Sequence, residues 1–185
     1  KELNGGHENV IFSARYFPFN SFNLYSGGWD RTIRLWDVRH GHTTAVLFGT
    51  QIVGDSLDMA SDGHTLVSGG GTHGEGLMIW DTRKHEAPVR TIEFSPGQVR
   101  NPKIEPIINA VRFIPRTRQI IATATDDDYP AKIFNFQTGE VVESFFNKCP
   151  RATACDVVHK DGNQLCIGDA NGVTQIIARD DEKKI

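Results

Sequence analysis

The 185-residue chain contains little of what several broad functional classes require. Its apolar runs fall well short of the roughly 18 residues that a membrane-spanning helix needs, so we expect a soluble protein that does not bind membranes. It has 20 Lys and Arg against 23 Asp and Glu, a net charge of −3 and no block of basic residues. The usual electrostatic basis for nucleic-acid binding is therefore lacking.

The start of the chain lacks targeting features. Its first ten residues, KELNGGHENV, include neither an initiator methionine nor the basic-then-apolar pattern of a signal peptide, so we expect a piece of a longer product. The three cysteines, Cys149, Cys155 and Cys166, do not have metal-ligand spacing. An odd number of such cysteines indicates reduced thiols, which predicts a cytoplasmic protein with the nucleus as the alternative compartment. Helical periodicity is lacking too, which favours an all-β chain.

One phrase recurs four times along the chain. Its best copy, Leu24–Asp37, reads LYSGGWDRTIRLWD: a short apolar strand, a glycine-rich turn, and a second strand that alternates apolar and polar residues before ending in Trp-Asp. This pattern is typical of a β-hairpin. The other copies depart increasingly from it and are Leu66–Asp81, Ile120–Asn135 and Leu165–Ile177.

The spacing of the copies indicates the size of the repeating unit. It is 44 residues from Trp36 to Trp80, 54 from Trp80 to Phe134, and 43 from Phe134 to Ile177. The longer middle interval contains Ser95–Ile107, SPGQVRNPKIEPI, whose proline and glycine content predicts an inserted loop. A further apolar strand precedes each hairpin and follows the first three. A period of about 40 to 45 residues with four short strands is typical of a β-propeller blade.

We therefore predict an all-β fold: a partial β-propeller of about four blades, each a four-stranded antiparallel sheet, within a single domain. The predicted blades are approximately 5–49, 50–94, 95–146 and 147–180. Because four units fall short of the usual ring, we expect the carboxy-terminal half of a larger propeller, or a half-ring that closes with a second chain. Something must then cover the apolar faces of the two end blades, which would otherwise promote aggregation.

The first unit resembles a known type of blade. Gly6-His7, Ser26, Asp30 and the closing Trp36-Asp37 look like one complete WD repeat, the β-transducin type of propeller blade. The resemblance covers nearly the whole chain and weakens along it. It implies that His7, Ser26, Asp30 and Trp36 form a hydrogen-bonded chain that locks the blade. Buried polar groups of this kind must satisfy one another, because each costs roughly 1–3 kcal/mol if unpaired.

The later blades keep fewer of these four positions, so we predict a full lock only in the first. The residues assigned to the lock are Thr50, Ser68 and Trp80 in the second blade, Thr123 and the acidic turn around Asp127 in the third, and Asn171 in the fourth. The turn of the second blade is also two residues longer. Because Phe134 and Ile177 stand at the tryptophan place, we expect the last two blades to rely on apolar packing.

Other groups of chemically capable residues have simpler structural explanations. His7, Ser26 and Asp30 are the residue types of a hydrolase triad, but the repeat already explains them as structural. The remaining groups lack metal-ligand spacing or, for the glycines, the helix that a phosphate cradle needs. These groups are His40, His42, His64 and His73, Asp126 to Asp128, and Gly69 to Gly76. We predict a protein that is not an enzyme, with no catalytic residue, metal or cofactor.

An arginine follows each intact Trp-Asp pair by two residues, at Arg39 and Arg83. Within the WD-repeat family, a phrase that ends in this way resembles the box through which many propellers dock on the adaptor of cullin-type ubiquitin ligases. The alternative is that each arginine only pairs with the preceding aspartate of its own blade. We take Arg39, Arg83 and also Arg31 as candidate protein-binding residues.

Three functions remain open on the sequence alone. The first is a non-catalytic scaffold whose turns bind other proteins, because a rigid repeat frame carries variable turns. The second is narrower: a substrate receptor of a cullin-type ubiquitin ligase that docks through Arg39 and Arg83. The third is an enzyme or small-ligand protein that uses the ring channel, with Asp55, Asp58 and His64 as candidate residues.

Overall fold

The computed structural model describes residues 5–72, 75–95, 106–126, 128–145, 151–158 and 161–179. These residues form β-strands and connecting turns, and none of them lies in a helix. The prediction of an all-β chain is confirmed. Within the same residues there is no helix with the length and hydropathy of a membrane-spanning segment.

The strands group into four antiparallel sheets, in which neighbours along the chain are hydrogen-bonded neighbours in space. Sheet 1 comprises β1 (Ile11–Phe17), β2 (Asn20–Gly28), β3 (Thr32–Asp37) and β4 (His42–Phe48), and sheet 2 comprises β5 (Leu57–Met59), β6 (Thr65–Gly69), β7 (Leu77–Asp81) and β8 (Arg90–Ile92). Sheet 3 comprises β9 (Ile108–Ile114), β10 (Gln119–Ala124), β11 (Ala131–Asn135) and β12 (Val141–Phe145), and sheet 4 comprises β13 (Ala152–Val157), β14 (Gln164–Asp169) and β15 (Thr174–Ala178).

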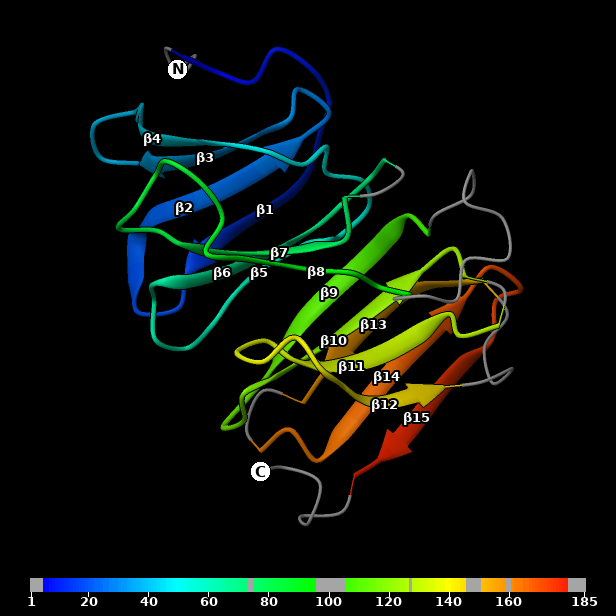
Figure 1. The fold of residues 1–185 in the computed structure, drawn as a ribbon. Coiled ribbons are helices and arrows are strands. Elements are labelled where there is room, and N and C mark those ends of the chain that lie inside the picture. Colours follow the sequence, from blue (N-terminus) through cyan, green and yellow to red (C-terminus); the bar gives the residue numbers. More distant parts are fainter. Residues whose placement is uncertain are drawn as a thin grey trace.

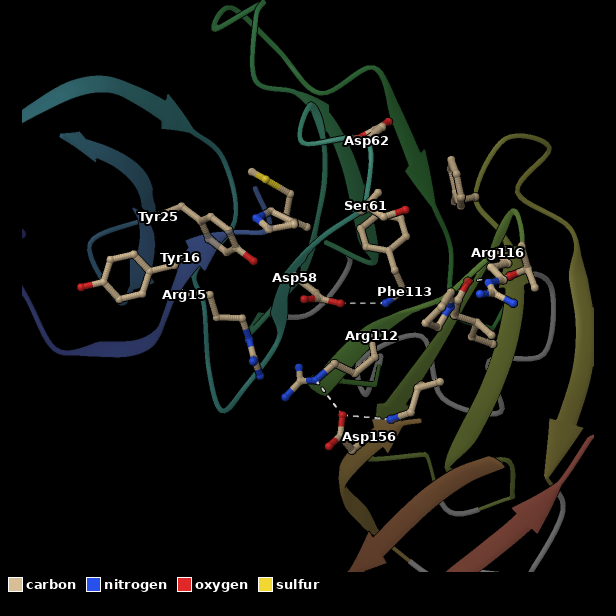
Figure 2. Close-up of a pocket in the computed structure, with 18 of the residues that line it drawn as sticks. Arg15, Tyr16, Tyr25, Asp58, Ser61, Asp62, Arg112, Phe113, Arg116 and Asp156 are labelled. Atoms are coloured by element: carbon tan, nitrogen blue, oxygen red, sulfur yellow. Dashed lines mark hydrogen bonds and ion pairs between the residues drawn. The ribbon is translucent and has the colours of Figure 1, made fainter. Parts of the chain in front are cut away.

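The sheets follow one another in chain order, from the blue sheet at one end of the molecule to the red sheet at the other (Figure 1). The first strand of each sheet contacts the first strand of the next, so β1, β5, β9 and β13 form an inner row. These inner strands line a cleft (Figure 2). The arrangement confirms the predicted partial propeller, in which each sheet is one blade. The prediction of four strands in every blade holds for sheets 1 to 3, whereas sheet 4 has three strands among the described residues.

Glycine permits the close turns and contacts of this architecture. In the β3–β4 turn, Gly41 has a φ of 72°, a left-handed conformation that favours glycine, and its N–H donates to the Asp37 carbonyl at 2.8 Å. After β4, Gly49 lies against the Trp80 indole, where a Cβ would come within 2.7 Å of the ring. The chain can therefore turn sharply out of β3 and pass closely over the next sheet.

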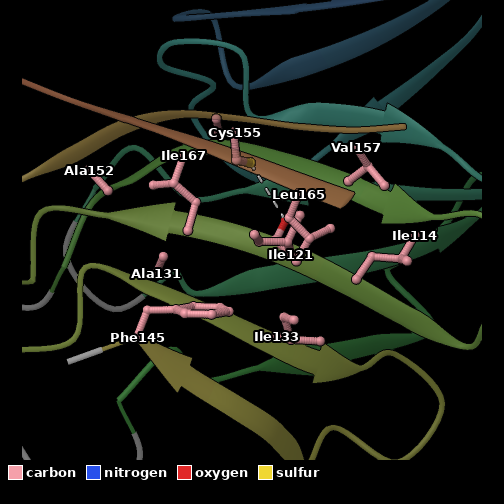
Figure 3. Packing of buried hydrophobic residues seen from close by; sticks show 11 residues of the cluster. Ile114, Ile121, Ala131, Ile133, Phe145, Ala152, Cys155, Val157, Leu165 and Ile167 are labelled. Carbon is pink, nitrogen blue, oxygen red and sulfur yellow. Dashed lines mark hydrogen bonds between the residues drawn. The ribbon is translucent and has the colours of Figure 1, made fainter. Parts of the chain in front are cut away.

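An apolar core fills the space between each pair of adjacent sheets. Between sheets 3 and 4, Ile121 and Ile133 pack with Leu165 and Ile167, all of them almost fully buried (Figure 3). Burial of each such side chain contributes about 1.5–3 kcal/mol to folding. Because every residue of β10 is buried, sheet 3 is covered on both faces.

Some predicted features lie outside the described residues. They are His73, Gly74, Asp127, Phe146, Cys149 and residues 96–105 of the loop predicted at Ser95–Ile107. The sheets themselves occupy residues 11–48, 57–92, 108–145 and 152–178, and the boundaries assigned to the blades stay a prediction.

Candidate functional site

In sheet 1, the structure brings together the four side chains assigned to the lock. The Trp36 indole Nε1 donates to Ser26 Oγ at 2.8 Å, and Ser26 Oγ lies 2.7 Å from His7 Nε2. Because the indole N–H can only donate, the Ser26 hydroxyl gives its own proton to His7 Nε2. The single ring N–H of His7 is then on Nδ1, which donates to Asp30 Oδ2, 2.8 Å away.

Asp30 is the end point of this chain. Its carboxylate also accepts the Thr32 hydroxyl at 2.9 Å and the Glu8 backbone N–H at 3.1 Å. Burial opposes ionisation, but the hydrogen bonds from His7 and Thr32 hold the pKa of Asp30 below its ordinary value. The carboxylate therefore ties the segment before β1 to the β2–β3 turn.

The same three residues have the connectivity of a hydrolase triad, with serine bonded to histidine and histidine bonded to aspartate. Ser26 is only 3 % exposed, however, and its oxygen already accepts the Trp36 N–H. A catalytic nucleophile must instead be open to its substrate. The geometry of His7, Ser26 and Asp30 therefore suits a structural network within sheet 1.

Sheet 2 builds a comparable network with a residue that the sequence analysis did not identify. Trp80 Nε1 donates to Ser68 Oγ at 2.9 Å, as in sheet 1. At the histidine place, the Thr50 hydroxyl donates to Glu75 Oε2 at 2.8 Å, and the Gln51 N–H donates to the same oxygen at 3.2 Å. Glu75, which lies in the longer turn, thus has the same role in sheet 2 that Asp30 has in sheet 1. It is the one carboxylate between Gly70 and Gly76, which is the signal that could have identified it.

The assignment of Thr123 to the serine place in sheet 3 is wrong. Ile120 pairs with Phe134 across β10 and β11, as Leu24 pairs with Trp36 in sheet 1. The residue two positions further along is Ser26 in sheet 1 but Ala122 in sheet 3. Thr123 is one position further, and its hydroxyl is buried without a hydrogen-bond partner among the described residues.

Sheet 3 packs on both faces through apolar residues, as expected, but it also has a polar network that the sequence analysis did not foresee. Ser95 Oγ donates to Asp126 Oδ2 at 2.7 Å, which repeats the contact between the histidine place and a turn carboxylate. Buried Lys132 donates to Ser95 Oγ at 2.8 Å and to the Phe94 carbonyl at 2.9 Å. Burial lowers the pKa of Lys132, and Asp126 opposes this effect.

Sheet 4 has no such network among its described residues. Leu165 pairs with Ile177, so the serine place is occupied by the apolar side chain of Ile167. The Asn171 N–H donates to Asp169 Oδ1 at 2.9 Å within the β14–β15 turn. Apolar packing therefore dominates in this sheet.

Arg39 and Arg83 have the same geometry in equivalent turns. Arg39 donates to Asp37 through Nε at 3.1 Å and Nη2 at 2.6 Å, and Arg83 donates to Asp81 through the same two atoms at 2.8 Å each. These bonds hold the pKa of both aspartates well below the ordinary value. Both arginine side chains remain more than half exposed.

Arg31, the third candidate for protein binding, lies at the opposite end of sheet 1. Its Nη2 donates to Glu75 Oε1 at 2.5 Å, so it joins the β2–β3 turn to the β6–β7 turn of the next sheet. The sequence analysis did not foresee this pairing, because Arg31 and Glu75 are far apart along the chain and only the packing of sheets 1 and 2 brings them together.

The inner strands carry a charge pattern that the sequence analysis missed. Arg15 on β1 and Asp58 on β5 oppose Tyr25 and Val67, which hold equivalent positions in β2 and β6. By the same register, Arg112 on β9 and Asp156 on β13 occupy this position in sheets 3 and 4. The charge therefore alternates in sign from sheet to sheet. The available signal for this pattern was a charged residue at the same position in each of four otherwise largely apolar strands.

Asp55 links these charges between sheets. Arg15 Nη2 lies 2.7 Å from Asp55 Oδ2, and Arg112 donates to the same oxygen. Arg112 Nε also lies 3.6 Å from Asp156 Oδ1 (Figure 2). Burial opposes ionisation of Asp55, but the two guanidinium groups hold its pKa below the ordinary value. An ion network thus connects sheets 1 to 4 along the inner row.

The cleft beside this network has a volume of about 700 Å³. Asp58 lies in its wall and accepts the Phe113 N–H at 2.8 Å. Burial raises the pKa of Asp58, while that hydrogen bond and the two arginines partly counter the effect. Of the sequence candidates for a channel site, Asp58 lines the cleft, Asp55 lies in the ion network, and His64 lies outside the cleft lining, in the β5–β6 turn.

Comparisons with known proteins agree with these features. Residues 1–37 match the model of the family described as WD domain, G-beta repeat, and this range includes His7, Ser26, Asp30 and Trp36. The chain is 27 % identical to Protein tipD of Dictyostelium discoideum over 141 residues, which cover 76 % of this chain and 21 % of tipD.

Two further relatives extend the comparison. Nuclear distribution protein nudF of Aspergillus niger is 28 % identical over 138 residues, which cover 74 % of this chain and 28 % of nudF. A guanine nucleotide-binding protein subunit beta of Arabidopsis thaliana is 29 % identical over 107 residues, which cover 55 % of this chain and 28 % of that subunit. The chain thus spans less than a third of the length of these three relatives.

Proposed function

We propose that the chain is a WD-repeat protein and a non-catalytic scaffold that binds other proteins through its turns, because its first 37 residues match the WD model and its relatives include a guanine nucleotide-binding protein subunit beta. One observation carries the proposal: Arg39 and Arg83 occupy equivalent turns of consecutive sheets, with the same geometry and with exposed guanidinium groups. The residue types that could support catalysis in sheet 1 are instead buried and hydrogen-bonded to one another.

The pairing of each arginine with its own aspartate supports such a surface. Asp37 and Asp81 hold the two guanidinium groups in fixed orientations, so little conformational entropy is lost when a partner binds. A guanidinium has five donors, and each of these two uses only Nε and Nη2 on its aspartate. The remaining donors can bind a carboxylate or carbonyl of a partner.

Affinity capture from cell extract tests the scaffold proposal. The matched baits are the wild-type chain, Arg39→Ala/Arg83→Ala, and Arg151→Ala, which removes an exposed arginine from a turn at the opposite end of the sheets. We expect wild type and Arg151→Ala to capture the same proteins. The double variant should capture about tenfold less of them, or less still. Thermal denaturation should be nearly unchanged, because exposed ion pairs contribute little to stability. Equal capture by all three baits would contradict the proposal.

The narrower proposal is a substrate receptor for a cullin-type ubiquitin ligase, with Arg39 and Arg83 on the ligase adaptor. The repetition of the same arginine geometry in two consecutive sheets supports it. The test is co-precipitation of the adaptor with wild type and with Arg39→Ala/Arg83→Ala. Loss of the adaptor from the double variant is expected, and its failure to precipitate with wild type would remove this proposal.

We also propose a cytoplasmic or nuclear location. Cys155 and Cys166 are free thiols, which suit a reducing compartment. Fluorescence imaging of the chain tagged at either end tests the location, and accumulation in the secretory pathway would contradict it.

A further inference from the structure

Each carboxylate that lines the cleft along the inner strands is bound by another group of the protein. Of the carboxylates that line it, Asp58 accepts the Phe113 N–H. Asp62 accepts two backbone N–H groups and the Thr65 hydroxyl within its own turn. Asp156 Oδ1 accepts the Val157 N–H and lies 3.6 Å from Arg112 Nε. Each of these carboxylates is thus already engaged by the protein.

Donors in the same cleft remain unused. Arg15 donates to Asp55 through Nη2, but its side chain is 33 % exposed and its Nη1 makes no hydrogen bond among the described residues. Arg116, in the β9–β10 turn, is exposed and makes no ion pair or side-chain hydrogen bond within the same part of the chain. Figure 2 shows Arg15 and Arg116 on opposite sides of the cleft. An occupant that fits the unused donors must therefore supply acceptors at both sides.

The other groups in the wall suit a peptide. Phe113 packs edge-on against Phe136 with 5.3 Å between ring centroids, and both rings line the cleft. Aromatic walls with a few polar groups and a volume of about 700 Å³ match the general character of sites that hold a few residues of a ligand.

We propose that this cleft binds an acidic segment of a partner protein, with Asp or Glu carboxylates of that segment on Arg15 and Arg116. This inference rests on the proposed function as a scaffold and names the chemistry of one partner. Arginine suits the task because its planar guanidinium binds a carboxylate through two hydrogen bonds. The site is separate from Arg39 and Arg83, neither of which lines the cleft.

Fluorescence anisotropy with peptide pools tests the inference on the whole chain. The pools are fluorescein-labelled peptides, random except at alternating positions fixed as Glu, Gln, Lys or phosphoserine. We expect the Glu pool to bind about tenfold more tightly than the Gln pool and to weaken as salt is added. Equal binding of the Glu and Gln pools, or preference for Lys, would overturn the proposal. Tighter binding of phosphoserine than of Glu would also overturn it, in favour of a phosphorylated segment.

Two variants locate the binding. Arg116→Gln should reduce the affinity for the Glu pool to that for the Gln pool, whereas Arg118→Gln, in the same turn but outside the cleft lining, should leave it unchanged. Arg15→Lys keeps the charge beside Asp55 but removes the planar guanidinium, so it should weaken binding of the Glu pool severalfold. Equal effects of Arg116→Gln and Arg118→Gln would overturn the assignment to the cleft.

The outcomes also separate this inference from the scaffold proposal. If capture of partners depends on Arg39 and Arg83 but the Glu pool does not bind, the cleft inference fails and the scaffold proposal stands. The opposite outcome is that Arg39→Ala/Arg83→Ala binds the Glu pool like wild type and also captures the same proteins as wild type. The cleft inference then stands, and the proposal that Arg39 and Arg83 bind partners fails.

Discussion

Three carboxylates have the same structural role, one in each of the first three sheets. Asp30, Glu75 and Asp126 each accept a hydrogen bond from the residue that stands at the histidine place: His7, Thr50 and Ser95 respectively. The partner residue changes in size and type, and the carboxylate changes its position in the turn to reach it. What is kept from sheet to sheet is therefore a hydrogen bond between two connections, because unpaired groups at these places would destabilise the fold.

Substitution of Asp30 directly tests this hydrogen-bonding role. Asp30→Ala leaves His7, Thr32 and the Glu8 N–H without their acceptor, so the free energy of unfolding should fall by about 2–4 kcal/mol. Thr50→Ala and Asn171→Ala should cost less. After Thr50→Ala, Glu75 still binds Arg31. Among the described residues, Asn171 bonds to Asp169 through its backbone N–H and not through its side chain. Urea denaturation measures all three, and equal losses would contradict the prediction.

Asp58 should make stability depend on pH in the opposite sense from an ion-paired carboxylate. Burial raises its pKa in the folded protein, so the charged form disfavours folding above that pKa, and the penalty disappears as the pH falls towards the ordinary value near 3.8. Asp58→Asn should therefore raise the urea midpoint at pH 7, and the gain should vanish near pH 4. A gain that grows on acidification, or a loss at pH 7, would contradict the assignment.

At the scale of a strand, register decided which sequence assignments held. Apolar alternation predicts the hairpins well, because a strand shifted in register by one residue would expose its core residues to solvent. It does not distinguish Ala122 from Thr123 as the residue at the serine place, since both are small and adjacent, and only the pairing of Ile120 with Phe134 decides. Networks that join different sheets, such as Ser95 with Lys132, depend on packing between distant segments and left no local pattern.

Lys132 is the element-scale test of the network in sheet 3. It pairs with Ala122 across the sheet, and Met78 holds the equivalent position in sheet 2. Lys132→Met should lower the free energy of unfolding by about 1–3 kcal/mol, because the Phe94 carbonyl and Ser95 lose a buried donor. Lys84→Met, at an exposed turn, is the matched control and should have little effect in the same denaturation experiment. If the two variants behave alike, the network does not stabilise sheet 3.

At the scale of the whole molecule, the repeat spacing was sufficient to predict the number of sheets and their order. The charge alternation along the inner row was not recognised, because a search for repeated phrases looks for similar residues and this position changes sign from Arg15 to Asp58. The ion network arises only when the inner strands are placed beside one another. The cleft and its arginines could therefore not be identified from any one repeat.

The two end sheets expose residues whose counterparts are buried elsewhere. Tyr16 on β1 corresponds by register to Met59 on β5, yet Tyr16 is 59 % exposed and Met59 is 6 % exposed. On β15, Ile176 is 73 % exposed, whereas its counterparts Ile79 and Ile133 are buried against the following sheet. Each end face thus corresponds to one half of the interface that joins the other sheets.

These two exposed end faces should make the isolated chain self-associate. Ile176 of one copy can pack against the Tyr16 face of another, a head-to-tail contact that removes exposed apolar surface from water. Light scattering during gel filtration should give a mass above the 20.6 kDa of the single chain. Ile176→Asp should shift the mass towards that value, whereas Val89→Asp, which places the same charge at an exposed residue before the outer strand β8, should not. A monodisperse 20.6 kDa species for wild type would show that the end faces are stable in water without a partner.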